Sequence, residues 1–483
     1  MAGRAAPGFR AEHHLVRRGR GRRGLRGRPE RGGVPHRRSG LSSNHERRRT
    51  GCAGEVVPVE RIMDVVAEAH RIGGAGVLWP GFDLAAIPIL LYGTEEAWLI
   101  GHPAPPEGYG HAGEVAGRPV YRGPVRPELA GNTAAPVGGH LTALVNLSDS
   151  PPTDPGALAR LILHEAFHVF QQTAFPDLPR MDAAALQAMA AYPENDPANN
   201  AMAIVENRLL ARALEGDPAA PGAFVSMRQH RHRQLVRMDR GDAVVYEQTV
   251  EWVEGTPTYV ELKAGAPTDG LVERLQTHNL GGRHAAYRRF YDTGAAQALL
   301  LDRVAPGWQA RIADAGGCLQ RLLEESLTEP LPPVNQVVVA EGLAALLEAE
   351  QEAEAERQAR IAALLRQLDE GPGLAVEIRL PPEVQGLMWD PTNLLTISPG
   401  RRLHTRFCGA VGPDGLRVTI HALCLEEWGE RGRRFRLRLP GRPEVQRGGR
   451  LRIVTEALSV DAPYGHIEEE PGLMRVQLWL SRR

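Results

Sequence analysis

Hydrophobic positions divide the chain into a strand-rich first part, a helical middle and a strand-rich end. Short apolar runs between residues 84 and 147, broken by Gly and Pro, predict a small antiparallel sheet. From about residue 155 the apolar positions recur at helical spacing, and from residue 374 alternating runs such as LAVEIRL and MRVQLWL predict an antiparallel β domain. The pattern therefore predicts an α+β protein.

The helical middle is divided into separate segments by Gly, Pro and Asp positions. Asp154 can accept hydrogen bonds from the first free N–H groups of the first helix, and Pro155 suits its first position. A pattern of apolar and charged residues over 339–368 predicts a long amphipathic helix with a solvated charged face, which we interpret as scaffold. The other expected helices are 155–173, 181–191, 198–215, 221–237, 243–263, 268–278 and 283–303.

The first of these helices carries charge where a core helix should be apolar. The run LARLILHEAFHVFQQ (158–172) places His164, Glu165 and His168 among hydrophobic side chains, and an unpaired buried carboxylate is destabilising. Residues four apart on a helix share a face, with Cβ atoms roughly 6 Å apart, so the two imidazoles can bind one ion. This HExxH pattern predicts a Zn²⁺ site with Glu165 as the general base. The alternative is a pair of core histidines satisfied by other side chains.

A catalytic zinc site needs a third protein ligand and leaves one position for water. We predict Glu254, because it borders the apolar face of its helix and because Gly255 beside it allows a second backbone to approach closely. Glu251 is an alternative ligand; otherwise it lies on a solvated helix face, or it orients a ligand histidine through a hydrogen bond. We interpret the remaining candidates as surface, solvated-face or ion-pair residues: Glu206, His230, His232 and Glu247.

Three short motifs in the helical middle resemble one enzyme family. HEAFH and the later run EGTPTYVE (254–261) resemble the gluzincin metallopeptidases, the thermolysin-like group, in which two helices supply His, His and Glu to zinc. FYDTGAAQALLLDRV (290–304) is similar to the Tyr-x-Lys-Gly segment of aminopeptidase-N-type and glycyl-aminopeptidase-type enzymes, whose tyrosine hydroxyl stabilises the oxyanion. The resemblance covers about residues 155–305. It implies a mainly helical, zincin-like catalytic domain, with Tyr291 as the oxyanion donor and Thr293 in the place of the family's lysine.

These residues predict a zinc-dependent metallopeptidase, a hydrolase that acts on a peptide or protein substrate. His164, His168 and Glu254 would hold Zn²⁺, which lowers the pKa of its water towards about 7. Glu165 would take the proton and deliver it to the leaving amine, while Tyr291 stabilises the oxyanion. The alternative is a non-catalytic metal-binding or scaffold protein whose C-terminal β domain binds a partner.

The run LTALVNL (141–147) leads towards the HExxH helix. We expect it to form the edge strand of the first sheet and to pair with an extended substrate. Together the patterns predict five parts: a disordered Arg-rich segment at 1–54, a β-rich part of the catalytic unit at 55–150, the helical HExxH catalytic domain at 151–330, a long amphipathic helix at 331–372 and a β domain at 373–483.

Arginines are concentrated at the start of the chain. Residues 1–50 hold 15 Arg against three Glu, so the rest of the chain carries the net negative charge. No aromatic residues are interleaved with the arginine cluster to stack on bases, and we therefore expect no nucleic-acid partner. The four cysteines are scattered without CxxC spacing, and the basic start lacks the apolar run of a secretory signal. We expect a cytoplasmic protein without a membrane span, because no apolar run reaches the required ~18 residues. The oligomeric state stays open.

Overall fold

The computed structural model describes most of the chain from residue 59 to residue 480. The predicted disorder of the Arg-rich segment at 1–54 lies outside the described residues. The described ranges are 59–74, 76–125, 131–148, 154–277, 285–384, 386–389, 393–398, 400–429 and 432–480.

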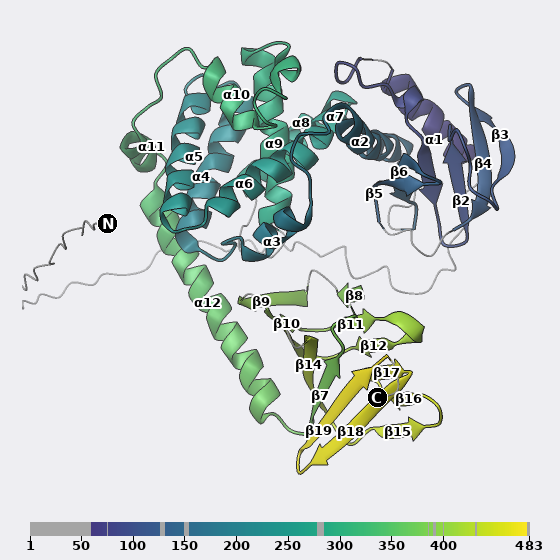
Figure 1. Cartoon of the computed structure of the whole chain (residues 1–483). Helices are drawn as coiled ribbons and strands as arrows, with labels where there is room; N and C mark the ends of the chain where they lie inside the picture. The colour runs from purple at the N-terminus through teal and green to yellow at the C-terminus, as the bar shows by residue number, and fades with distance from the viewer. Residues whose placement is uncertain are drawn as a thin grey trace, which may run out of the picture. The chain divides into compact units, whose positions relative to one another are not determined.

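One helix and a six-stranded sheet come first along the described chain. The elements are α1 (Val59–Ile72), the 3₁₀ helix η1 (Leu84–Ala86), β1 (Ile89–Tyr92), β2 (Glu96–Ile100), β3 (Gly110–Val115), β4 (Arg118–Pro124), β5 (Thr133–Val137) and β6 (His140–Asn146). The strand order is β3-β4-β2-β1-β6-β5 (Figure 1). The apolar run of β1 is buried on both faces of this sheet, because Ile89 and Leu91 join the large core that α1 enters, whereas Leu90 and Tyr92 join a second apolar cluster.

Two predictions about this sheet are wrong. The sheet is mixed, since β1 and β6 pair in parallel, and the predicted strand 141–147 lies inside it between β1 and β5. β5 is the edge strand instead, because it forms a hairpin with β6 through Gly138 and Gly139, whose φ angles of 54° and 83° suit a two-residue turn. Pro136 in β5 is compatible with an edge position, since proline has no N–H to donate.

The middle of the chain is helical, as predicted. Its elements are α2 (Pro155–Ala174), α3 (Ala183–Ala191), α4 (Pro197–Leu214), α5 (Ala220–Arg237), α6 (Gly241–Val250), the π turn η2 (Glu251–Gly255), α7 (Thr256–Lys263), α8 (Thr268–Thr277), α9 (Ala285–Val304), the 3₁₀ helix η3 (Trp308–Arg311), α10 (Leu319–Ser326) and α11 (Val334–Ala340). The predicted start of α2 is confirmed, because the Asp154 carboxylate accepts a hydrogen bond from the Gly156 N–H at 3.0 Å. The predicted helix 243–263 is α6 and α7 joined by the π turn, with Pro257 in the first turn of α7.

A long helix and two sheets complete the chain (Figure 1). The elements are α12 (Leu343–Glu370), β7 (Leu374–Leu380), β8 (Gly386–Trp389), β9 (Leu394–Ser398), β10 (Arg401–His404), β11 (Cys408–Val411), the 3₁₀ helix η5 (Pro413–Gly415), β12 (Arg417–Ile420), β13 (Cys424–Gly429), β14 (Gly432–Leu439), β15 (Glu444–Arg447), β16 (Leu451–Val454), β17 (Leu458–Ala462), β18 (Tyr464–Glu470) and β19 (Leu473–Trp479). One sheet has the order β18-β19-β7-β14-β13-β10-β9 and the other β15-β16-β17-β12-β11-β8, and residues of both form one apolar core.

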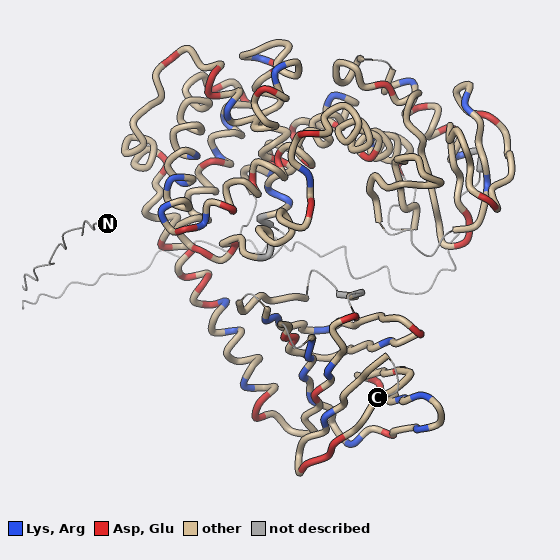
Figure 2. Tube along the Cα trace, viewed as in Figure 1, with Lys and Arg blue, Asp and Glu red and all other residues tan. Residues whose placement is uncertain are grey.

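The prediction of an antiparallel β domain needs one correction, because β19 pairs with β7 in parallel. Such a pair requires a long connection, and here the rest of the β domain provides it. The long helix α12 carries acidic and basic residues along its length, as predicted (Figure 2). It also buries Ile361 and Leu368 against Leu403 and Leu425 of the seven-stranded sheet that contains β10 and β13. None of the helices in the described part of the chain combines the length and the apolar character needed to cross a bilayer.

Candidate metal centre

The helix α2 holds three of the predicted site residues on the side that faces α7. Several of its hydrophobic residues, among them Ile162 and Phe167, are fully buried in the large core and fix the rotation of the helix. His164 and Glu165 are buried and His168 is nearly so, and the two imidazole rings lie with their centroids 4.9 Å apart. The expected pairing of both histidines on one helix face is therefore present.

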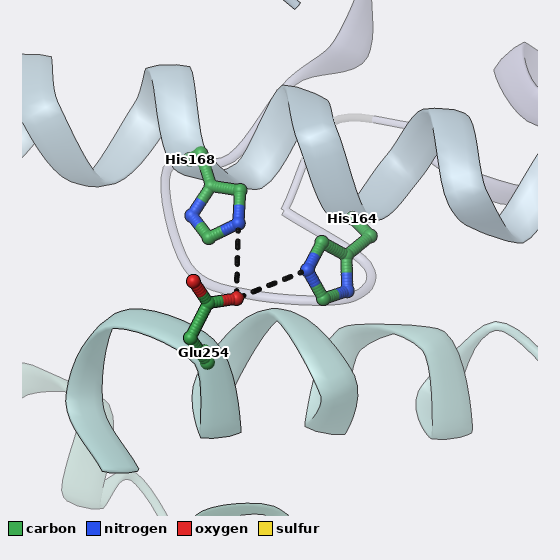
Figure 3. A group of neighbouring side chains, drawn as sticks. All are labelled: His164, His168 and Glu254. Atoms are coloured by element: carbon green, nitrogen blue, oxygen red, sulfur yellow. Dashed lines mark ion pairs between the residues drawn. The ribbon is translucent and has the colours of Figure 1, made fainter. Parts of the chain in front are cut away.

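The π turn supplies the third predicted residue. The Glu254 Oε2 atom lies 3.7 Å from the Nε2 atom of His164 and 3.5 Å from the Nε2 atom of His168 (Figure 3). One ligand atom from each of the three residues lies within 4.8 Å of the others. Within the described ranges this is the one group of His, Cys, Asp and Glu side chains that could hold a metal ion.

Two of the separations within this group are close to those around a zinc ion. A tetrahedral Zn²⁺ with bonds of about 2.0–2.1 Å keeps its ligand atoms about 3.3 Å apart. The observed separations of 3.7 and 3.5 Å from the carboxylate to the two imidazoles exceed that value by only a few tenths of an ångström. Two imidazoles and one carboxylate also form a known donor set for zinc, which leaves the fourth position open.

Hydrogen bonds from the far sides of the two rings fix their orientation. The His164 Nδ1 atom lies 2.5 Å from the Glu261 Oε1 atom, and the His168 Nδ1 atom lies 3.1 Å from the Gln171 Oε1 atom. The Gln171 amide in turn donates to the Trp252 carbonyl at 2.9 Å. Both Nε2 atoms are thereby turned towards Glu254.

Glu261, and not Glu251, therefore orients a histidine of the candidate metal site. The sequence contained a signal for this role, because Glu261 follows Glu254 by seven residues, about two helical turns, and so shares its face. The alternatives of a role at a ligand histidine and of a solvated helix face are both wrong for Glu251, because its buried carboxylate accepts hydrogen bonds from Arg228 and Thr293 instead.

The charges of the cluster favour a cation at its centre. Burial alone would lower the pKa of His164, but hydrogen bonds to Glu254 and Glu261 raise it to about 10. Burial would raise the pKa of Glu254, but hydrogen bonds with the two imidazoles hold it well below its ordinary value. A proton on an imidazole and a bound metal cation would meet the same negative charge.

Glu165 lies beside the three residues and faces a cavity of about 830 Å³. The cavity is lined by residues of β5, α2, the π turn and α9. The Glu165 side chain is buried, and its Oε2 atom has no hydrogen-bond partner among the described residues. Burial raises the pKa of Glu165, although the two neighbouring imidazoles oppose this effect. Glu165 therefore lines the same cavity as the candidate ligands and has one carboxylate oxygen without a hydrogen bond among the described residues.

Two tyrosines of α9 complete the wall of the cavity. The Tyr291 ring stacks on His164, with centroids 6.4 Å apart and an angle of 17° between the planes, so the predicted residue lies at the site. Its hydroxyl donates to the Tyr287 hydroxyl at 3.1 Å, and the Tyr287 hydroxyl donates to the Glu254 Oε1 atom at 2.9 Å. Tyr287 was not predicted, because only its contact across to the π turn distinguishes it from a core aromatic.

A contact between two glycines brings α9 close to the π turn. A Cβ atom on Gly255 would lie 2.6 Å from the Cα atom of Gly294, so the two backbones touch at this point. The expectation that Gly255 allows a second backbone to approach closely is confirmed. The contact places the tyrosines of α9 within hydrogen-bonding reach of Glu254.

Comparisons of the chain with protein-family models, curated proteins and solved structures find no match. Function therefore has to be inferred from the site itself.

Two of the remaining candidates, Glu206 and Glu247, belong to a buried ionic network behind the π turn. Glu206 accepts hydrogen bonds from Arg228 and Arg231 of α5, and Glu247 accepts from Arg231. Each of the two carboxylates is fully buried. Glu206 is thus an ion-pair residue, as interpreted, but its partners lie on a neighbouring helix. The interpretation of Glu247 as part of a solvated face is wrong.

His232 is also buried, and its Nε2 atom lies 2.8 Å from the Glu247 Oε2 atom, so it is not the surface residue that we expected. His230 is half-exposed, in agreement with the expectation. The misassignments share one cause, because charged residues on an amphipathic helix are assigned to solvent unless their partners on other helices are known.

Proposed function

We propose that the protein is a zinc-dependent metallopeptidase of the gluzincin type, which hydrolyses peptide bonds. One observation carries the proposal: two imidazoles and one carboxylate converge beside a second, buried carboxylate that has a free oxygen. The first three residues, His164, His168 and Glu254, would hold Zn²⁺. The fourth, Glu165, has the position expected of a general base.

Zinc held by these residues would lower the pKa of a water molecule towards about 7 and polarise the scissile carbonyl. The Glu165 carboxylate accepts the proton of the attacking water. The same residue then delivers that proton to the leaving amine. Tyr291 lines the cavity, and we assign it the role of hydrogen-bond donor to the oxyanion, for which its hydroxyl hydrogen turns from Tyr287 to the substrate.

The edge strand β5 provides a surface for an extended peptide, because residues 132–134 line the cavity. Val137 and His140 flank the two-residue turn, so their backbone groups, and those of Ala135, pair within the hairpin. Ala134 therefore directs its N–H and C=O away from β6 and can pair with a substrate strand. Pro136 is the next residue of β5 whose backbone faces away from β6, and it has no N–H to donate. Pairing with a substrate strand is therefore confined to the part of β5 next to the metal site.

The alternative of a structural metal site is less well supported. A structural zinc site usually closes its fourth position with a protein ligand. Among the described residues only three ligand atoms converge, and the open side of the group faces the cavity. A scaffold protein would also have no use for a buried general base beside the metal.

The proposal is tested by metal analysis of the purified chain and digestion of a peptide library, each with and without a chelator. We expect about one zinc ion per chain and cleavage that the chelator abolishes. Glu165→Gln should retain zinc and lose activity by orders of magnitude, because a proton acceptor is removed but no ligand is. Unchanged turnover of this variant, or cleavage by the metal-free protein, would refute the proposal.

A further inference from the structure

The carboxylate of Glu254 has two oxygens, and different residues occupy them. Oε2 faces both imidazoles, whereas Oε1 accepts the hydrogen bond of Tyr287 at 2.9 Å. A carboxylate can bind a metal through one oxygen or through both, and binding through both would occupy a further position around the ion. The partner of Oε1 therefore affects how many positions remain for water and substrate.

We propose that Tyr287 is a positioning residue. Its hydroxyl keeps Oε1 of Glu254 hydrogen-bonded, so that Oε2 is the single oxygen that binds the metal. The proposal rests on the proposed metal site, and it assigns a role to a residue that the sequence motifs do not mark. Tyr287 does not replace Tyr291 as the oxyanion donor, because its hydroxyl hydrogen is held by the Glu254 carboxylate, whereas that of Tyr291 is held by a neutral hydroxyl.

The surroundings of Tyr287 hold it in this orientation. Its hydroxyl accepts from Tyr291 at 3.1 Å, and the two rings pack edge to face with centroids 5.2 Å apart. The backbone contact between Gly294 and Gly255 fixes α9 against the π turn that carries Glu254. The tyrosine and the carboxylate therefore sit on two segments whose separation is set by direct backbone contact, which is the rigidity that a positioning role requires.

The hydrogen bond also stabilises the bound carboxylate directly. Hydrogen bonds to metal ligands orient those ligands and contribute to metal affinity, and their loss typically costs about tenfold or more. Removal of the Tyr287 hydroxyl should therefore weaken metal binding even if the fold is unchanged.

The experiment measures Zn²⁺ affinity of the full chain by competition with a chromophoric chelator after metal removal. Tyr287→Phe keeps the ring and removes only the donor, and it should weaken zinc binding by about tenfold or more. Tyr246→Phe is the matched control, because the buried Tyr246 hydroxyl has no hydrogen-bond partner among the described residues. That variant should change the affinity by less than about twofold.

A second measurement separates positioning from general stabilisation of the fold. In a Glu254→Ala background the acceptor is gone, so adding Tyr287→Phe should change the remaining zinc affinity by less than about twofold. The visible absorption of Co²⁺ bound in place of zinc should weaken in Tyr287→Phe, because a second carboxylate oxygen raises the coordination number. Tyr246→Phe should leave this spectrum unchanged.

Three outcomes would overturn the inference. Zinc affinity of Tyr287→Phe within about twofold of the wild type would show that the hydroxyl does not act on the ligand. An equal loss in the Glu254→Ala background would show that Tyr287 acts through the fold. Absence of zinc binding by the wild type would remove the proposed function as well, whereas the first two outcomes leave a zinc-dependent peptidase intact.

Discussion

Replacement of Gly294 with alanine tests whether the contact between α9 and the π turn positions the metal ligands. A Cβ atom at this position would lie 2.6 Å from the Glu251 carbonyl oxygen and 2.8 Å from the Gly255 Cα atom. Both neighbours belong to the backbone, and real Cβ atoms essentially never show contacts under 3.0 Å, so the two segments have to move apart. The same movement would lengthen the hydrogen bond from Tyr287 to Glu254.

We expect Gly294→Ala to lower the free energy of unfolding, whereas exchange of Gly for Ala inside a helix usually raises it. Exchange of Gly for Ala inside a helix is favourable by about 1 kcal/mol, whereas overpacking of a tight contact costs about 1–3 kcal/mol. Because Gly294 meets backbone and not a flexible side chain, we place the cost at the upper end of that range. The free energy of unfolding should therefore fall by about 2 kcal/mol. Zinc affinity should fall with it, since Tyr287 and Glu254 are drawn apart.

The assay is urea unfolding of the metal-free protein, followed by zinc competition. Gly270→Ala in α8 is the control, because a Cβ atom there would meet only a flexible guanidinium nitrogen of Arg274 at 3.6 Å. The control should gain about 0.4–1 kcal/mol of stability and keep its zinc affinity. If Gly294→Ala is stabilised like the control and binds zinc normally, the glycine contact does not set the position of α9 and the reasoning is refuted.

Three further predictions concern ligands, catalysis and pH. His168→Ala should lose the stoichiometric zinc that the wild type holds, as measured by metal analysis after dialysis; full retention would exclude His168 as a ligand. Tyr291→Phe should retain zinc but lower kcat by about 10²-fold or more, and a zinc-loaded variant with normal kcat would end the oxyanion assignment. Burial would raise the pKa of Glu206, but the guanidiniums of Arg231 and Arg228 outweigh it and hold this pKa at about 2. The folded-state pKa is thus depressed, so the stabilisation is fully present above the unfolded-state value of about 4.3 and is lost as the pH falls through about 2. The difference in free energy of unfolding between the wild type and Glu206→Gln, measured by urea unfolding, should therefore decrease by roughly 2 kcal/mol when the pH falls from 7 to 3. A difference that does not change with pH would contradict this.

The helix that carries HExxH could be predicted because its signals are local. Asp154 and Pro155 mark its start, and the spacing of His164 and His168 determines that both lie on one face. The position of Glu254 could also be chosen from its neighbours, because Gly255 beside it marked a close backbone approach. In each case the deciding residues are within a few positions of one another in the chain.

Glu261 and Tyr287 could not be assigned from the sequence in the same way. Their roles depend on contacts between segments that are far apart in the chain: Glu261 meets His164 of α2, and Tyr287 meets Glu254 of the π turn. The edge strand was missed for a related reason, since the Gly- and Pro-rich stretch before β6 reads as loop until its pairing is seen. Local patterns determine which elements form, but they do not determine which elements meet.

The π turn explains how Glu251 and Glu254, although close in the chain, point in different directions from one helix. In a regular α-helix Glu251 and Glu254, three residues apart, would point within about 60° of each other. The wider π turn increases that angle, and Glu251 faces Arg228 and Thr293 in the buried network while Glu254 faces the cavity.

The same geometry explains why a threonine fits at position 293. It stands where the resembling enzymes have lysine, and its hydroxyl donates to the Glu251 Oε1 atom at 2.5 Å from a fully buried position. The Glu251 carboxylate already accepts from the Arg228 guanidinium at 2.6 Å, so a neutral donor completes the pair without adding a second buried cation. A lysine at 293 would bring an extra positive charge into a network whose glutamates and arginines already pair. A neutral residue at position 293 thus fits the charge balance behind the π turn.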